Sequence, residues 1–161
     1  MRKILHFPVV LFVFSILISC SESVVIEEYK DIPNGIWHVD SLASFEFEIE
    51  DTLTWYDINY NVRYAADYAY FNLYVTYYIE DSIGSIVESE LQNLVLFDKK
   101  TGEPLGQGLG DLYDREIPIF QKYRFKKSGK HFFKVKQFMR IEELPGILAF
   151  GVRIADSSQE E

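Results

Sequence analysis

Residues 44–50 read Ser-Phe-Glu-Phe-Glu-Ile-Glu, so apolar and charged side chains alternate along the stretch. Successive side chains of a β-strand point to opposite faces, which places Phe45, Phe47 and Ile49 on one face and the glutamates on the other. One apolar and one charged face is typical of an antiparallel strand that covers a core on one side and meets solvent on the other. The stretch therefore predicts a half-buried antiparallel strand.

The same alternation recurs further along the chain, with turn residues between the segments. Further strands are predicted at residues 54–64, 70–80, 86–97, 130–140 and 147–155. The intervening segment 106–123, which is rich in glycine and contains a proline, is expected to form a long ordered loop. Aromatic residues make up 16% of the chain, which favours strands over a helical bundle. We therefore predict an all-β fold, an antiparallel β-sandwich of about seven to nine strands, with jelly-roll and immunoglobulin-like connectivity both open.

The N-terminus carries a short cationic region, an apolar run and the single cysteine of the chain. Arg2 and Lys3 precede the apolar residues 7–18, and Ser19 then places a small side chain before Cys20. This arrangement is typical of a bacterial lipoprotein signal. The apolar run would span roughly 18 Å as a helix, which is less than the hydrocarbon core of about 30 Å, so we do not expect it to remain as a membrane span.

The predicted signal sets the domain boundaries. We expect residues 1–19 to be a signal peptide that is removed, and 20–35 to be the lipidated N-terminus and a tether that lifts the domain off the membrane. Residues 36–156 would form a single β-sandwich domain, and 157–161 a frayed tail. Diacylglycerol and acyl chains on Cys20 would anchor the protein durably and leave no free thiol for a disulfide, a thiolate metal site or a nucleophile.

The charge of the chain restricts its partners. The formal net charge is −9, and removal of the signal peptide makes the mature chain more negative still. An acidic surface argues against binding to nucleic acid or to anionic lipid headgroups through a basic face. Acidic surfaces are also common in domains outside the cytoplasm, so the charge does not identify a partner.

The residue types that carry chemistry do not form a recognisable active site. The glycine-rich run 106–111 lacks the strand and helix of a dinucleotide fingerprint and the Gly-Lys-Ser/Thr of a P-loop, so its glycines are expected to serve a tight loop. Asp111 and Asp114 with a loop carbonyl would offer oxygen ligands to a divalent cation, although their spacing differs from that of an EF-hand. His38 and His131 have no companion at the spacing of metal ligands or of a catalytic triad. We therefore predict no catalytic residues, no metal, no small-molecule substrate and no cofactor beyond the covalent lipid.

Four aromatic residues are candidates for an interaction surface, namely Trp37, Trp55, Tyr74 and Tyr78. They could stack on sugar rings, form the centre of a protein interface, or pack in the core under a second sheet. One concave groove rimmed by polar groups would favour sugar, and a flat patch would favour protein.

The chain resembles a known family through motifs that extend over nearly all of its mature part. These motifs are Trp37-His38-x-Asp40-Ser41 before Phe45-Glu46-Phe47, Tyr60-Asn61-Val62-Arg63, Tyr70-Phe71-Asn72-Leu73-Tyr74, Leu105-Gly106-x-Gly108-x-Gly110-Asp111, Gln137-x-Met139-Arg140, Leu144-Pro145-Gly146-Ile147 and Gly151-Val152-Arg153-Ile154. They resemble the GldH family of gliding-motility lipoproteins from Bacteroidetes.

The resemblance implies a non-catalytic envelope lipoprotein that is needed for gliding motility and linked to the type IX protein secretion apparatus. Its partners would be the membrane, through the lipid anchor, and other gliding or secretion proteins of the envelope. It implies the outer membrane as the location and leaves open whether the domain faces the periplasm or the medium. Only Cys20, as the lipidation site, is carried over from the family. The alternative from a different class is a surface glycan-binding lipoprotein that uses its exposed aromatic residues.

Overall fold

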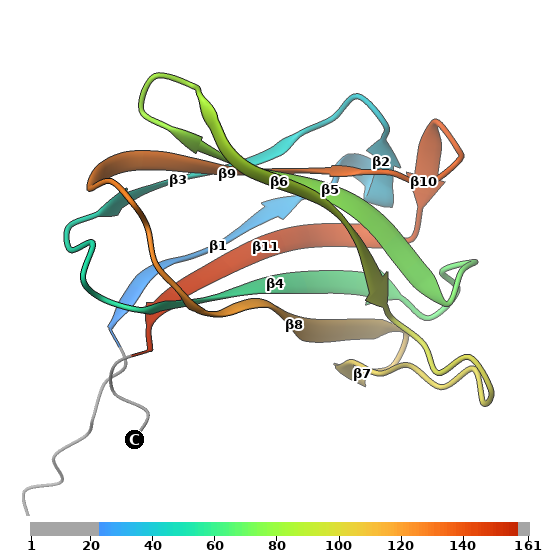
Figure 1. The fold of residues 1–161 in the computed structure, drawn as a ribbon. Coiled ribbons are helices and arrows are strands. Elements are labelled where there is room, and N and C mark those ends of the chain that lie inside the picture. Colours follow the sequence, from blue (N-terminus) through green and yellow to red (C-terminus); the bar gives the residue numbers. More distant parts are fainter. Residues whose placement is uncertain (1–22, 158–161) are drawn as a thin grey trace, which may run out of the picture.

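The computed structural model describes residues 23–157, which fold into two facing antiparallel sheets (Figure 1). The strands are β1 (Val24–Asp31), β2 (Ile36–His38), β3 (Ala43–Ile49), β4 (Tyr56–Ala65), β5 (Asn72–Asp81), β6 (Ile86–Val95), β7 (Gln107–Leu109), β8 (Leu112–Tyr123), β9 (Gly129–Gln137), β10 (Glu143–Pro145) and β11 (Ile147–Asp156). A short 3₁₀ turn, η1 (Pro33–Gly35), precedes β2. Among the described residues, no helix is long and apolar enough to cross a membrane.

The strand order resolves the connectivity that the sequence leaves open. One sheet has the order β1-β11-β4-β8-β7, the other has the order β3-β9-β5-β6, and β10 and β2 form a separate two-stranded ribbon. The first long strand pairs with the last, β3 pairs with β9, and the chain crosses repeatedly between the two sheets. This is jelly-roll connectivity, so the predicted antiparallel sandwich is confirmed in its jelly-roll form.

The alternating segments form strands because one face of each is covered by the opposite sheet. In β3, Phe45 and Ile49 are fully buried, as the alternation predicts, and Phe45 is completely inaccessible to solvent. Aromatic rings from both sheets meet in the middle, where Tyr60 lies with its ring centroid 6.0 Å from that of Phe133 and 5.2 Å from that of Phe150. These contacts account for the high aromatic content, because large rings fill the space between two sheets.

Most of the predicted tether is part of the folded domain. Residues 24–31, expected to lie in the tether 20–35, form β1 and pair with β11, so that prediction is wrong from Val24 onward. A bulge between Val24 and Ile26 interrupts the two-residue period of β1. β1 also lies at the edge of its sheet, where less of a strand is buried. For both reasons the sequence lacks the clear alternation of apolar and polar residues that predicts a strand.

The segment 106–123 is a second correction, because it forms the β7–β8 hairpin instead of a long loop. β7 ends its pairing with β8 at Asp114, so the later part of β8 is an edge on that side. An edge strand tolerates Pro118, which cannot donate a ladder hydrogen bond. The glycines serve the hairpin, since a Cβ at Gly108 would lie 2.1 Å from the carbonyl oxygen of Leu112.

The two ends of the sandwich differ in what they carry, and we name them after one residue each. The Ser23 end holds the start of β1, the end of β11 and the loops after β3 and β8, as the pairing of Asp156 with Tyr56 shows. The Gln137 end lies at the opposite ends of these strands, where Ala65 pairs with Leu112. β4 has ten residues, which places the two ends roughly 30 Å apart. Figure 1 shows both described termini at the same end of the molecule.

Candidate interaction surface

A groove of about 440 Å³ opens on the outer face of the β3-β9-β5-β6 sheet at the Gln137 end. The residues that line it are Tyr70, Asn72, Tyr74, Leu91, Phe138, Met139, Arg140 and Ile141. They come from the start of β5 and the residues just before it, from the middle of β6 and from the segment that follows β9. We call this the distal groove.

One wall of the distal groove is held in place by a buried amide. Gln137 is fully buried, and its side-chain oxygen accepts a hydrogen bond from the backbone N–H of Met139 at 2.7 Å. Its side-chain nitrogen donates to the carbonyl oxygen of Ile141 at 3.0 Å. The backbone N–H of Phe138 donates to the carbonyl oxygen of Tyr74 at 2.7 Å, which joins this wall to β5. A hydrogen-bonded wall gives the groove a defined shape before any partner binds.

Several large aromatic and apolar side chains of the distal groove are exposed to solvent. Tyr74 is 39% exposed and Phe138 is 53% exposed, and Tyr70 and Leu91 are also open to solvent. Aromatic and leucine side chains gathered in one concavity, which Arg140 also lines, are typical of surfaces that bind another molecule.

The structure does not bring the four predicted aromatic residues together. The proposal of Trp37 as a surface residue is wrong, because Trp37 is 1% exposed. β2 pairs with β10, which directs Trp37 onto Phe150 at a centroid distance of 5.2 Å. The indole N–H donates to the carbonyl oxygen of Ser41 at 3.0 Å, which satisfies its only polar group.

The other three predicted residues lie at separate places. Tyr74 lines the distal groove. Tyr78 is half-buried further along the same face, in a shallow depression with Leu42 and Lys136. Trp55 is 42% exposed at the Ser23 end. The single groove that would favour sugar is therefore not formed by this set.

Sequence reasoning missed three groove residues, Tyr70, Leu91 and Phe138. Phe138 falls within the predicted strand 130–140, but nothing in the local pattern shows that Leu91 of β6 lies on the same face nearby. The available signal was that all three side chains are large and aromatic or apolar.

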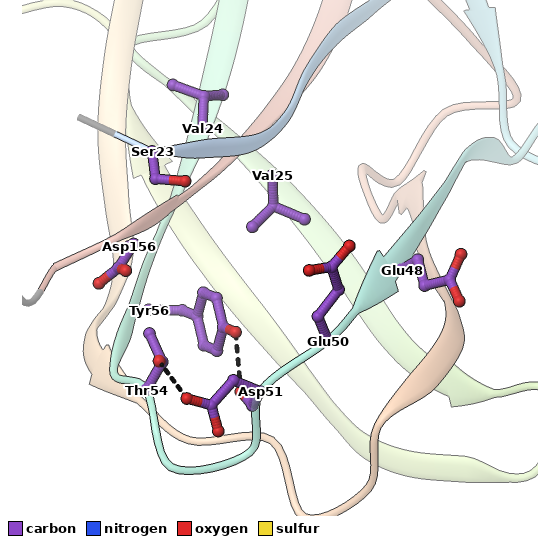
Figure 2. Close-up of a pocket in the computed structure, with 9 residues that line it drawn as sticks. All are labelled: Ser23, Val24, Val25, Glu48, Glu50, Asp51, Thr54, Tyr56 and Asp156. Carbon is purple, nitrogen blue, oxygen red and sulfur yellow. Dashed lines mark hydrogen bonds between the residues drawn. The ribbon is translucent and has the colours of Figure 1, made fainter. Parts of the chain in front are cut away.

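A second concavity lies at the Ser23 end and is lined by carboxylates (Figure 2). Glu48, Glu50, Asp51 and Asp156 surround it, together with Ser23 at the start of the described chain. Nowhere within residues 23–157 do three or more Asp, Glu, His or Cys side chains stand close enough to hold a metal ion. We therefore do not assign a metal site to this concavity.

Asp114, in the β7–β8 hairpin, is engaged in a salt bridge. Both carboxylate oxygens of Asp114 accept hydrogen bonds from Arg63, from Nε at 2.9 Å and from Nη2 at 3.2 Å. The same contact raises the pKa of Arg63. A bidentate arginine neutralises the charge that a cation would otherwise meet at Asp114.

Buried tyrosines are not poised for acid–base chemistry. Burial raises the pKa of Tyr77, with a further contribution from the charges of Glu88 and Glu90. Burial likewise raises the pKa of Tyr123, which also hydrogen-bonds Glu88. A raised pKa keeps a phenol protonated at neutral pH, which is the opposite of what a tyrosine base requires.

Comparison with known proteins identifies the relatives of the chain. A family model described as GldH lipoprotein matches residues 24–154. The chain is 34% identical over 160 residues to "Gliding motility lipoprotein GldH homolog" of Christiangramia forsetii, covering 94% of this chain and 96% of the relative. It is 29% identical over 146 residues to "Gliding motility lipoprotein GldH" of Flavobacterium johnsoniae, covering 86% and 89%.

Solved structures add no argument about function. The structure of infectious bursal disease virus Gx strain matches with a TM-score of 0.33 and 12% identity, and the match covers 86% of this chain and 31% of that chain.

Proposed function

The chain belongs to the GldH lipoprotein family, and from this premise we propose that it is a lipid-anchored, non-catalytic interaction module that serves gliding motility. The names of two relatives support the gliding role. Cys20 lies outside the described residues, and its lipidation remains a proposal based on the sequence around it. The acyl lipid on Cys20 is the only group besides protein that this function requires.

The observation that carries the proposal is the distal groove. It gathers exposed Tyr74, Leu91 and Phe138 at the end of the sandwich opposite Ser23, where the chain leads toward Cys20. A binding surface on the side away from the lipid anchor is accessible to other envelope proteins. Aromatic side chains in a concavity supply a large share of the energy of protein interfaces.

We further propose the outer membrane as the location and a role in the assembly or stability of the type IX secretion and gliding apparatus. Partners in that apparatus would be proteins, since the acidic net charge disfavours nucleic acid. The proposal includes no small-molecule substrate.

The test replaces the chromosomal gene by one that encodes Tyr74→Ala with Phe138→Ala, in the bacterium from which the chain comes. Both side chains are exposed, so we expect the variant to keep its fold and its palmitate label. Gliding and type IX secretion should both be impaired, and chemical cross-linking in intact envelopes should lose the partner protein. Leu109→Ala is the matched control, because Leu109 is 94% exposed and apolar but lies on the β7–β8 hairpin outside the groove.

A folded groove variant that glides and secretes like the wild type would refute the proposal. If that variant instead lost binding to cell-surface polysaccharide, the glycan-binding alternative would replace it. Impaired gliding with intact secretion would remove the link to secretion and keep the gliding role.

A further inference from the structure

The loop between β3 and β4 holds two apolar side chains out in solvent at the Ser23 end. Leu53 is 75% exposed and Trp55 is 42% exposed. The loop is ordered by Asp51, whose carboxylate accepts hydrogen bonds from the backbone N–H of Leu53 at 2.7 Å and from the hydroxyl of Thr54 at 3.0 Å. The hydroxyl of Tyr56 donates to the backbone carbonyl of Asp51 at 2.8 Å (Figure 2). These contacts fix the loop in a shape that directs Leu53 outward.

Arg124 adds a cation to this pair of side chains. Its guanidinium lies 4.0 Å from the centroid of the Trp55 ring, and it donates to the carbonyl oxygen of Leu53 at 3.1 Å. An irregularity near the end of β8 brings it there, since Lys122 has a φ of +59° and its backbone N–H donates to the Asp57 carboxylate at 2.7 Å. Bulges commonly re-aim a side chain in this way. Trp55 and Leu53 therefore form an exposed apolar pair, and Arg124 contacts both residues.

This cluster lies next to the point where the chain leads to the proposed lipid anchor. Three Cα steps separate Cys20 from Ser23, which is at most about 11 Å of fully extended chain. The backbone N–H of Asp156 donates to the carbonyl oxygen of Ser23, and that of Ser157 donates to the carbonyl oxygen of Trp55, each at 2.9 Å. Trp55 is therefore about two strand spacings, or roughly 10 Å, from Ser23. The acyl chains of Cys20 are therefore attached within roughly 20 Å of Trp55, at the same end of the sandwich.

The charge at this end is mixed. Glu50, Asp51 and Asp156 line the concavity, and the loop after β8 carries the exposed cations Arg124, Lys126 and Lys127. Because both signs of charge are present, contact with neutral lipid depends on the apolar side chains of Leu53 and Trp55. Tryptophan is enriched at the boundary between headgroups and hydrocarbon, where arginine can reach lipid phosphates.

We propose that the Ser23 end rests on the membrane, with Leu53 and Trp55 inserted at the headgroup level. The proposal depends on the lipidation of Cys20 and names the surface that faces the bilayer. The distal groove then points away from the membrane by the length of the sandwich, roughly 30 Å, which suits a partner in the adjoining aqueous space.

The test uses the lipidated full-length protein in phosphatidylcholine vesicles. In the mature chain the thiol of Cys20 is blocked, so a cysteine introduced by Leu53→Cys is the only reactive thiol and accepts an environment-sensitive fluorophore. Leu109→Cys is the matched control at the opposite end, because Leu109 is also exposed and apolar. With phosphatidylcholine brominated in its acyl chains, we expect quenching at residue 53 to be several-fold stronger than at residue 109.

Intrinsic fluorescence gives a second measurement that leaves Leu53 unchanged. The chain has two tryptophans, and Trp37 is buried, so brominated lipid should quench the wild type but not Trp55→Phe. Equal quenching at residues 53 and 109, or no difference between wild type and Trp55→Phe, in protein that floats with the vesicles would overturn the membrane contact and leave the groove function intact. Wild-type protein that fails to float would overturn the lipid anchor and this proposal together.

Discussion

Two buried tyrosines of β4 should respond in opposite ways to the loss of a hydroxyl. Tyr60 and Tyr64 lie four residues apart on the same face, and both are fully buried. The Tyr64 hydroxyl donates to the carbonyl oxygen of Leu96 at 2.8 Å and accepts from the backbone N–H of Gly106 at 2.9 Å. The Tyr60 hydroxyl has no hydrogen-bond partner among residues 23–157, and burial strongly raises its pKa.

The expected magnitudes follow from these partners. Tyr64→Phe leaves the backbone N–H of Gly106 without its partner and removes one of two hydrogen bonds to the carbonyl oxygen of Leu96, which still accepts from the backbone N–H of Leu105 at 2.9 Å. The loss should lower the free energy of unfolding by about 1–3 kcal/mol. Tyr60→Phe removes a polar group whose burial costs about 1–3 kcal/mol, offset in part by the packing of one lost oxygen atom. We expect Tyr60→Phe to raise the free energy of unfolding by about 1 kcal/mol.

Urea denaturation of the lipidated protein in mild detergent measures both changes. The fluorescence of buried Trp37 reports unfolding, and equal slopes for all proteins would show that midpoints reflect stability. If Tyr60→Phe destabilised the protein as much as Tyr64→Phe, the hydroxyl of Tyr60 would be well satisfied and the reasoning would be refuted.

Three further predictions concern the core, the pH dependence and the anchor. Phe47→Ala should lower the free energy of unfolding by about 3–5 kcal/mol because a buried ring leaves a cavity, whereas Glu48→Ala on the solvent face should change it by less than about 0.5 kcal/mol; equal losses in urea denaturation would mean that the faces are misassigned. Since burial raises the pKa of Tyr77 and Tyr123 in the folded state, stability should be fully present below the unfolded value of about 10 and fall as the pH rises above it. Circular dichroism against pH, read with phenolate absorbance, checks this, and ionisation of all tyrosines before any loss of structure would contradict it. Cys20→Ala should abolish palmitate labelling and release the protein from membranes, and a labelled variant would rule out Cys20 as the lipidation site.

The sequence predicted the strands whose two faces differ most. The strands predicted at 44–50 and 54–64 correspond to β3 and β4. It failed at β1 and β8, which lie wholly or partly at sheet edges and contain a bulge or a proline. Ser157 was expected to fray but is buried, while residues 158–161 of the predicted tail lie outside the described part. Edge strands bury less surface, so selection on their alternation is weaker.

The candidate site was predictable only in part. Tyr74 was named as a candidate for an interaction surface, but its groove neighbours Leu91 and Phe138 come from β6 and from the segment after β9. Trp37 was expected at the surface, and only the pairing of β2 with β10 explains its burial.

By itself, the sequence determined the period of the strands, the all-β class and the cysteine that suits a lipid anchor. These features are local, because the direction of a side chain follows from its own backbone and a signal peptide is read as a linear segment. The tertiary structure alone decided the jelly-roll order, the distal groove and the place of Trp55 beside Ser23. Those features depend on which distant segments cover one another, and the free energy that selects them comes from burial between sheets and not from any local pattern.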